Sequence, residues 1–250
     1  YGDMDMEEKL NYIDKEYLST FEPRKIDSEI ALQKPFTETK IIEKRYSIST
    51  EESEENKSIF AYGAVIENNL DKELFIAMSV VNYALLLTPG APLKQAFLDA
   101  GIGNDISGSW ETSMKQPFFS IDVKNTNARD FERFREIMED TLKKIVSDGL
   151  DKKVLEAAIN TMEFRYREAD FGQFPKGLMY VLKSMDSWLY DDNEPFIHID
   201  SLETYQLLRD KIETSYYEDI IKKYLLENKH SVYVILNPEK GLAGKKEAVL

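Results

Sequence analysis

Two patterns of apolar residues run through the chain, and they predict strands and helices in mixed order. Phe119, Ile121 and Val123 alternate with polar or exposed-type positions, which is typical of a strand with one buried face. Strands are predicted at residues 39–47, 58–66, 102–112, 118–123 and 230–236, and helices at 4–20, 71–87, 92–100, 125–148, 151–167, 178–190, 201–211 and 215–226. Because this order lacks strict βαβ alternation, it favours an α+β domain of two layers, with helices on one face of a mostly antiparallel sheet.

Local signals sharpen several of these elements. Pro92 suits the first turn of a helix, and Gly101 suits the left-handed residue that ends it. The helix at 71–87 is apolar over most of its surface, so we expect it to be largely buried. The apolar helix at 178–190 predicts core packing for Trp188 and Tyr190, although such a pair could also stack on a ligand. Asn237-Pro238 is expected to stop the last strand.

Composition excludes some classes of function. The 250 residues include 32 basic and 46 acidic side chains, a net charge of −14, which predicts no nucleic-acid and no anionic-membrane partner. The chain has no cysteine, which excludes disulfides, thiolate metal sites and cysteine nucleophiles, and which fits a reducing compartment such as the cytoplasm of a bacterium. No apolar run approaches the roughly 20 residues of a membrane span. The chain opens without methionine, so we expect it to be part of a longer protein.

The residues alone indicate no catalytic constellation. His198 and His230 are the two histidines, and neither has a second histidine one helical turn away, so neither an HExxH nor an HxxEH zinc pair exists. A nucleophile elbow and a P-loop are also absent. Glu156, Glu163 and Glu168 could be acid–base groups, but the neighbouring Arg165 and Arg167 favour a solvated charged face. No catalytic and no metal-binding residue is therefore predicted.

Four stretches of the chain carry a family resemblance: PLKQAFLDAGIG, QPFFSIDVK, ARDFERFREIMEDTLKKIVSDGLDKKVLEAAINTMEFRYRE and FPKGLMYVLKSMDSWLYDDNEPF. The most specific signals are Glu163-Phe164, then residues 172–178 and then residues 188–191. These segments resemble the presequence-protease branch of the pitrilysin (insulinase-type) zinc metallopeptidases. The resemblance covers nearly the whole chain.

The resemblance implies an architecture and a place within it. Such proteases look like two halves, each of two similar α+β domains, that close as a clamshell around a peptide chamber. Zinc sits in the first domain on an HxxEH helix, whereas the helix at 71–87, which would align with it, has no histidine. The expected division is residues 1–22 as the end of a preceding domain, 23–38 as a linker, and 39–250 as the non-catalytic second domain. Zinc and the hydrolysis of peptide bonds are then expected of the parent protein, with no cofactor in this chain.

The resemblance also implies a peptide-binding edge strand. In insulin-degrading relatives an edge strand of the second domain pairs with the substrate, and the matching positions here are Ile106, Ser107, Gly108, Ser109 and Trp110. Gly108 would permit close backbone approach, although an ordinary glycine kink in a strand explains it equally well. Trp110 would contact the peptide or cover the sheet edge.

Two other classes of function stay open. The chain could be an inactive peptide-binding subunit of a separate catalytic chain, or an interaction scaffold without a peptide role. The expected partners are unfolded peptides and the other domains of the same polypeptide. If the fragment exposes apolar area, it could also dimerise.

Overall fold

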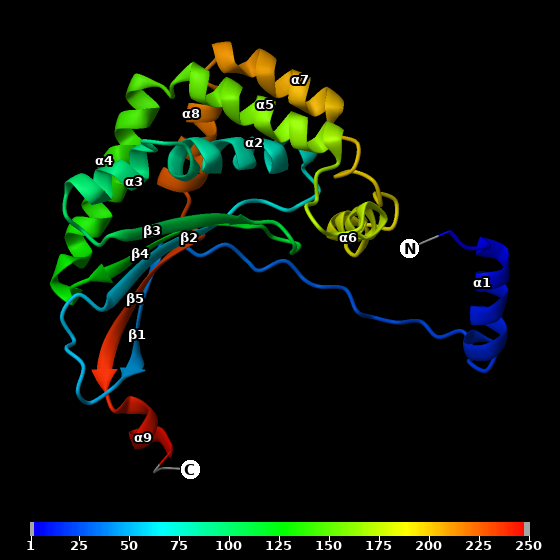
Figure 1. Cartoon of the computed structure of the whole chain (residues 1–250), viewed down its shortest axis with the longest axis horizontal. Helices are drawn as coiled ribbons and strands as arrows, with labels where there is room; N and C mark the ends of the chain where they lie inside the picture. The colour runs from blue at the N-terminus through cyan, green and yellow to red at the C-terminus, as the bar shows by residue number, and fades with distance from the viewer. Residues whose placement is uncertain (1–2, 248–250) are drawn as a thin grey trace.

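The computed structural model describes residues 3–247, and within that range five strands form one sheet in the order β1–β5–β2–β4–β3 (Figure 1). The strands are β1 (Lys40–Ile48), β2 (Ser58–Val65), β3 (Asp105–Glu111), β4 (Phe118–Thr126) and β5 (Ser231–Lys240). β1 and β5 run parallel, whereas β5–β2, β2–β4 and β4–β3 are antiparallel. The predicted mostly antiparallel sheet is confirmed.

A layer of helices covers one face of this sheet (Figure 1). This helix layer consists of α2 (Lys72–Asn82) with a π-helical turn (Tyr83–Leu87), α3 (Pro92–Asp99), α4 (Phe131–Asp148), α5 (Lys152–Glu168), α7 (Leu202–Asp210) and α8 (Tyr216–Ile221) with a π-helical turn (Lys222–Leu226). A short 3₁₀ turn at Ala128–Asp130 leads from β4 into α4, and another at Lys211–Glu213 joins α7 to α8. α6 (Lys176–Trp188) lies beside the layer, and α9 (Leu242–Glu247) follows β5.

The core lies between the sheet and the helix layer. Phe119, Ile121 and Val123 of β4 are fully buried there, as their alternation predicts. The ring of Phe134 on α4 lies 5.5 Å from that of Phe60 on β2 and 5.2 Å from that of Phe97 on α3, so aromatic contacts join the two layers. The α+β prediction of helices packed on one face is thereby confirmed.

The helical segment from α2 to α3 is more apolar than the sequence prediction allowed. Within residues 3–247, the segment Lys72–Asp99 is long and apolar enough to cross a membrane by length and composition, and its most apolar 18-residue window has a mean hydropathy of 1.7. However, 61% of its most apolar window is buried inside the fold, and a turn at residues 88–91 interrupts it. Its place in the core accounts for its composition.

The predicted helix at 125–148 begins six residues too early. β4 continues to Thr126, and α4 starts at Phe131. Thr126 Oγ1 donates to the backbone oxygen of Ser58 at 2.8 Å, and Asn127 Oδ1 accepts from the backbone N–H of Asn56 at 2.9 Å. These polar residues extend the β2–β4 pairing, so the sheet overrides the helical pattern here.

The predicted stop of the last strand at Asn237-Pro238 is also wrong. β5 continues to Lys240 because Tyr46 of β1 pairs with Pro238, whereas the pairing of β5 with β2 ends at Ile59 and Leu236. Pro238 therefore lies beyond the part of β5 that pairs with β2, so its lack of an N–H removes no hydrogen bond to β2.

The predicted core packing of Trp188 is wrong as well. Trp188 is 46% exposed, and Leu178, Val181, Leu182 and Leu189 of this segment are exposed as well. α6 instead turns Ser184 and Ser187 inward, and Ser187 Oγ donates to the backbone oxygen of Glu194 at 2.6 Å. The inward face of α6 therefore carries a polar contact to the segment that follows the helix.

α1 (Met6–Ile13), with a π-helical turn (Asp14–Leu18), stands apart from the body (Figure 1). No residue of α1 is buried, and its apolar side, including Leu10 and Ile13, is exposed. The residues between this helix and β1 form neither helix nor strand. The domain boundaries at residues 22 and 38 stay a prediction.

Candidate functional site

The five residues of the predicted peptide-binding strand lie in β3, at one edge of the sheet (Figure 1). β3 pairs with β4 on one side, with Ser107 opposite Asp122 and Ser109 opposite Ser120. Within residues 3–247 no strand pairs with its other side. An unpaired edge presents backbone donors and acceptors that an extended peptide can use.

β3 divides its side chains between two faces. Ile106, Gly108 and Trp110 alternate toward the helix layer, where Ile106 is buried. Ser107 is exposed on the opposite face, and Ser109 Oγ lies 3.0 Å from Ser120 Oγ there. An added strand would therefore meet small polar side chains on the side away from the helices.

Gly108 is explained by packing inside the fold. A Cβ atom at this position would overlap Leu86 Cδ1 and would lie 2.6 Å from the backbone oxygen of Ser120. The helix layer thus approaches β3 too closely for any side chain. The glycine is needed for this contact whether or not a peptide binds at the edge.

Trp110 packs against α2 on the helix side of β3. Its Nε1–H donates to the backbone oxygen of Phe75 on α2 at 3.1 Å, and the two rings meet edge-on with centroids 6.3 Å apart. The indole N–H is therefore already partnered by α2. The two roles foreseen for this residue, peptide contact and covering of the edge, stay predictions.

The face of the sheet opposite the helix layer is apolar. We call it the open sheet face; it carries the half-buried Ile59, Ala61, Val65, Phe118, Val232, Val234 and Leu236. The helix layer lies on the other side (Figure 1). Asp122 is a half-buried acid on this face, and its burial raises the pKa of the carboxyl, with the Lys124 ammonium acting in the opposite direction. The open sheet face continues to the β3 edge through Ser120 and Ser109.

The two histidines occupy structural positions. His198 is buried and stacks on Phe75 with ring centroids 4.0 Å apart. Burial lowers its pKa to about 4, although the nearby backbone of Asn69 opposes part of that shift. His230 precedes β5, and its ring meets Phe36 edge-on at 4.8 Å. Across residues 3–247, no group of three or more histidine or acidic side chains is arranged to hold a metal ion.

The glutamates of α5 belong to a charged surface. Glu163 Oε1 accepts from Arg167 Nη2 at 2.6 Å, and its Oε2 accepts from Arg209 Nη2 of α7 at 2.8 Å. Hydrogen bonds from Arg209 and then Arg167 lower the pKa of Glu163. The sequence suggested Arg165 and Arg167 as partners of these glutamates, whereas in the structure Glu163 pairs with Arg167 and Arg209. Glu156 and Glu168 are exposed.

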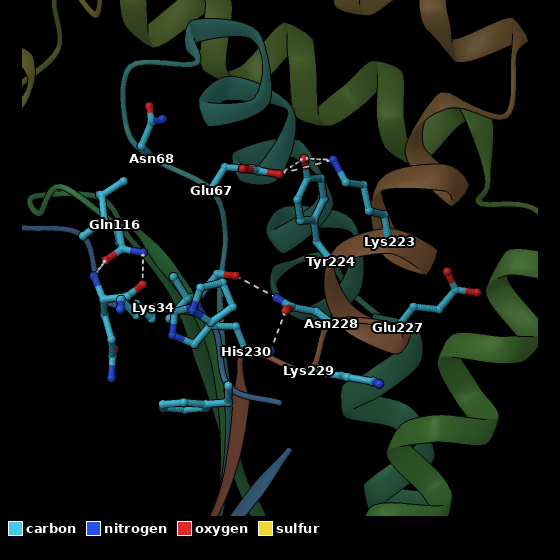
Figure 2. A pocket seen from close by; sticks show the side chains of 15 residues that line it. Lys34, Glu67, Asn68, Gln116, Lys223, Tyr224, Glu227, Asn228, Lys229 and His230 are labelled. Carbon is cyan, nitrogen blue, oxygen red and sulfur yellow. Dashed lines mark hydrogen bonds and ion pairs between the residues drawn. The ribbon is translucent and has the colours of Figure 1, made fainter. Parts of the chain in front are cut away.

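A cavity of about 580 Å³ lies where the linker meets the body (Figure 2). Residues 32–36 form one wall, and the ends of β2 and β5 form another. The carboxamide of Gln116 accepts from the backbone N–H of Gln33 at 2.6 Å and donates to its backbone oxygen at 3.3 Å. On the far wall Tyr224 and Lys223 bond to Glu67.

The structure also gathers polar residues that the sequence did not single out. Asn82 of α2, Lys183 and Asp186 of α6, and His198 line a second cavity of about 320 Å³ beside Trp110. We call it the β3 cavity. The available signal was a lone asparagine within the apolar run of residues 74–87, because such a run rarely carries a carboxamide without a use for it.

A protein-family model described as "Peptidase M16 inactive domain" matches residues 1–162, which is more than half of the chain. The chain is 42% identical over 250 residues to Protein HypA of Clostridium perfringens, with 100% of this chain and 26% of HypA covered. It is 30% identical over 255 residues to presequence protease 1, chloroplastic/mitochondrial, of Arabidopsis thaliana, with 99% of this chain and 23% of that protein covered. The chain thus spans about a quarter of the length of these curated relatives.

Solved structures share the fold. A mutant of the ferredoxin protease FusC in complex with Arabidopsis ferredoxin superposes with a TM-score of 0.66 at 14% identity, covering 96% of this chain and 24% of that chain. A peptidase M16 inactive domain from Pseudomonas fluorescens gives 0.58 at 13% identity, covering 84% and 47%. The chain therefore belongs to the peptidase M16 family, as a non-catalytic domain related to presequence protease.

Proposed function

We propose that this chain is the inactive repeat of a zinc-dependent metalloendopeptidase that degrades oligopeptides, and that it walls the peptide chamber and binds unfolded peptides along β3. The observation that carries the proposal is the unpaired edge of β3 beside the apolar open sheet face. Backbone hydrogen bonds at such an edge accept many sequences, which suits a protease of unfolded peptides. The names of the relatives, a presequence protease and a protease bound to ferredoxin, support a peptide substrate.

The catalytic centre of the proposed protease lies outside this chain. α2 carries no histidine, and the acids of α5 are paired or exposed. Zinc, which would activate the attacking water, and the glutamate that would accept its proton therefore belong to the rest of the parent protein. The expected partners of this domain are the other domains of the same polypeptide and the peptide substrate.

Backbone pairing at β3 can be tested without altering the protein. The probe is a nine-residue Thr/Val peptide with blocked ends, N-methylated at either its odd or its even residues. Only one edge of a bound strand faces β3, so one set of methyl groups should weaken binding at least tenfold and the other should not. Amide NMR signals of residues 105–111 should shift, with those of β1, the other edge of the sheet, as the internal control.

Shifts confined to β1, or equal losses with both methylated peptides, would contradict pairing at β3. No binding at all would favour an interaction scaffold without a peptide role. A Gly108→Pro change is a poor test, because its ring would collide with Leu86 and the fold itself would suffer.

The division of labour needs a second experiment. We expect zinc-dependent peptidase activity from a protein of the relatives' full length and none from this chain with added zinc. Activity of the chain alone would overturn the proposal. An inactive full-length protein that still binds peptide would favour a binding subunit that works with a separate catalytic chain. The relatives' length, about four times that of this chain, supports the single-chain protease.

A further inference from the structure

The β3 cavity lies where the edge strand ends. Trp110, within β3, and Thr112, just after it, line the cavity together with residues of α2 and α6. These two residues continue the alternation that sends Ile106 and Gly108 toward the helix layer. In a paired strand, residues directly opposite each other point to the same face. A peptide residue opposite Trp110 or Thr112 would therefore direct its side chain toward this cavity.

Two polar side chains of the cavity wall have unmet hydrogen-bonding groups. Asn82 is 8% exposed, and its Oδ1 has no partner. His198 is 5% exposed, and neither of its ring nitrogens has a partner at full hydrogen-bond geometry, although the backbone of Asn69 lies close enough to affect the pKa of the ring. A buried acceptor or donor without a partner costs roughly 1–3 kcal/mol, so a group that supplies the missing bonds gains affinity from them.

The charges in the wall favour an uncharged ligand. Lys183 and Asp186 have opposite charges; Asp186 is half-buried, and desolvation raises the pKa of its carboxyl, whereas Lys183 is exposed to solvent at the rim. His198, with a pKa of about 4, is neutral at pH 7. A charged group of a ligand would lose its hydration in the cavity, and the wall has no net opposite charge to compensate for that loss.

The remaining wall is partly apolar. Phe75, Leu87, Trp110 and Met162 line it together with the hydroxyl-bearing Ser79 and Thr112, so the cavity offers both apolar contact and hydrogen-bonding groups. That pattern matches a side chain with a methylene stem and an uncharged tip that both donates and accepts.

We propose that the β3 cavity is a subsite for the carboxamide side chain of a glutamine or asparagine in the bound peptide. The amide –NH₂ would donate to Asn82 Oδ1, and the amide oxygen would accept from the His198 ring or from Lys183. The inference rests on the proposed function, because pairing along β3 brings the side chain to the cavity.

The subsite can first be tested apart from strand pairing. The probe is N-acetylglutamine methylamide, followed through the indole N–H signal of Trp110. The chain has two tryptophans, so a Trp188→Phe variant leaves a single indole signal. We expect a saturable shift with this probe and at least a fivefold weaker response to N-acetylmethionine methylamide, which has a similar shape but no amide. Equal responses, or none, would overturn the subsite.

The second test uses the nine-residue Thr/Val peptide with one glutamine moved along it. At one position glutamine should improve binding at least fivefold over methionine and over glutamate. An Asn82→Leu variant should erase that preference and keep the binding of the methionine peptide. The variant should fold, because it removes a buried acceptor that has no partner. Asn11→Leu, on the exposed α1, is the matched control and should change nothing.

The outcomes separate the two proposals. Peptides that bind along β3 with no preference for glutamine would overturn the subsite and leave the proposed function standing. A glutamine preference that survives Asn82→Leu would place the recognition elsewhere and would also overturn it. A response to the small probe without any peptide binding would support the subsite and contradict pairing at β3.

Discussion

At the scale of single residues, alanine substitution of two strand glycines should have opposite effects on stability. A Cβ at Gly108 would overlap Leu86 Cδ1, whereas a Cβ at Gly63 would meet Val232 Cγ1 at 3.7 Å, an ordinary contact. Gly108→Ala should therefore lower the free energy of unfolding by about 2–3 kcal/mol, as overpacking does. Gly63→Ala should be neutral or slightly stabilising, because alanine loses less entropy in a strand. Urea unfolding followed by circular dichroism measures both, and equal stabilities would contradict the packing argument.

Asp122 gives a pH-dependent prediction at the same scale. Burial raises the pKa of Asp122 in the folded state, so its charged form destabilises the fold above that pKa. The free energy of unfolding therefore increases as the pH falls through the raised pKa and the carboxyl becomes neutral. Asp122→Asn should therefore raise the melting temperature at pH 7. The gain should vanish near pH 3, below the ordinary aspartate pKa of about 3.9, where both side chains are neutral. Asp105→Asn, an exposed control on β3, should give no such gain. A gain for Asp122→Asn that persists at pH 3 would rule out the charge as its cause.

At the scale of elements, the end of α5 is strained. Ala169 caps the helix in the left-handed conformation, with φ +47°. Glycine adopts this conformation without a side-chain penalty, so Ala169→Gly should stabilise the fold by about 0.5–1 kcal/mol. The matched control is Ala157→Gly on the exposed side of the same helix, which should cost about 1 kcal/mol. Thermal unfolding of the pair would show opposite signs, and a loss in both would contradict the capping argument.

Element existence followed from sequence better than element ends did. Alternation at Phe119 to Val123 and the spacing of Phe131, Phe134 and Met138 identify β4 and α4, because both patterns arise within one element. The ends depended on distant partners: Asn56 and Ser58 extend β4, and β1 extends β5 past Pro238. The apolar pattern of α6 could not reveal that Ser184 and Ser187 are its buried residues.

At the scale of the whole molecule, contacts between residues far apart in the sequence limit what the sequence alone can predict. The family resemblance implied the fold and the edge strand, and the structure places residues 106–110 at that edge. The parallel pairing of β1 with β5 joins the two ends of the domain and leaves no local signal. The same holds for the β3 cavity, which brings α2, β3 and α6 together, and for Leu86, which explains Gly108. Sequence patterns report the face of an element, and only the tertiary arrangement shows what that face meets.

The exposed apolar side of α6 predicts how the isolated chain behaves. Leu178, Val181, Leu182, Trp188 and Leu189 are exposed together, and a contiguous apolar surface of this kind favours association. We expect sedimentation equilibrium to show concentration-dependent self-association, weakened at least fivefold by Leu182→Glu. Leu98→Glu, at an exposed leucine on α3 outside this surface, is the matched control and should change little. Because the relatives are about four times longer, we expect the rest of the parent to cover α6, so Leu182→Glu in a full-length protein should destabilise the joined domains. Association that ignores Leu182→Glu would move the contact to the exposed face of α1.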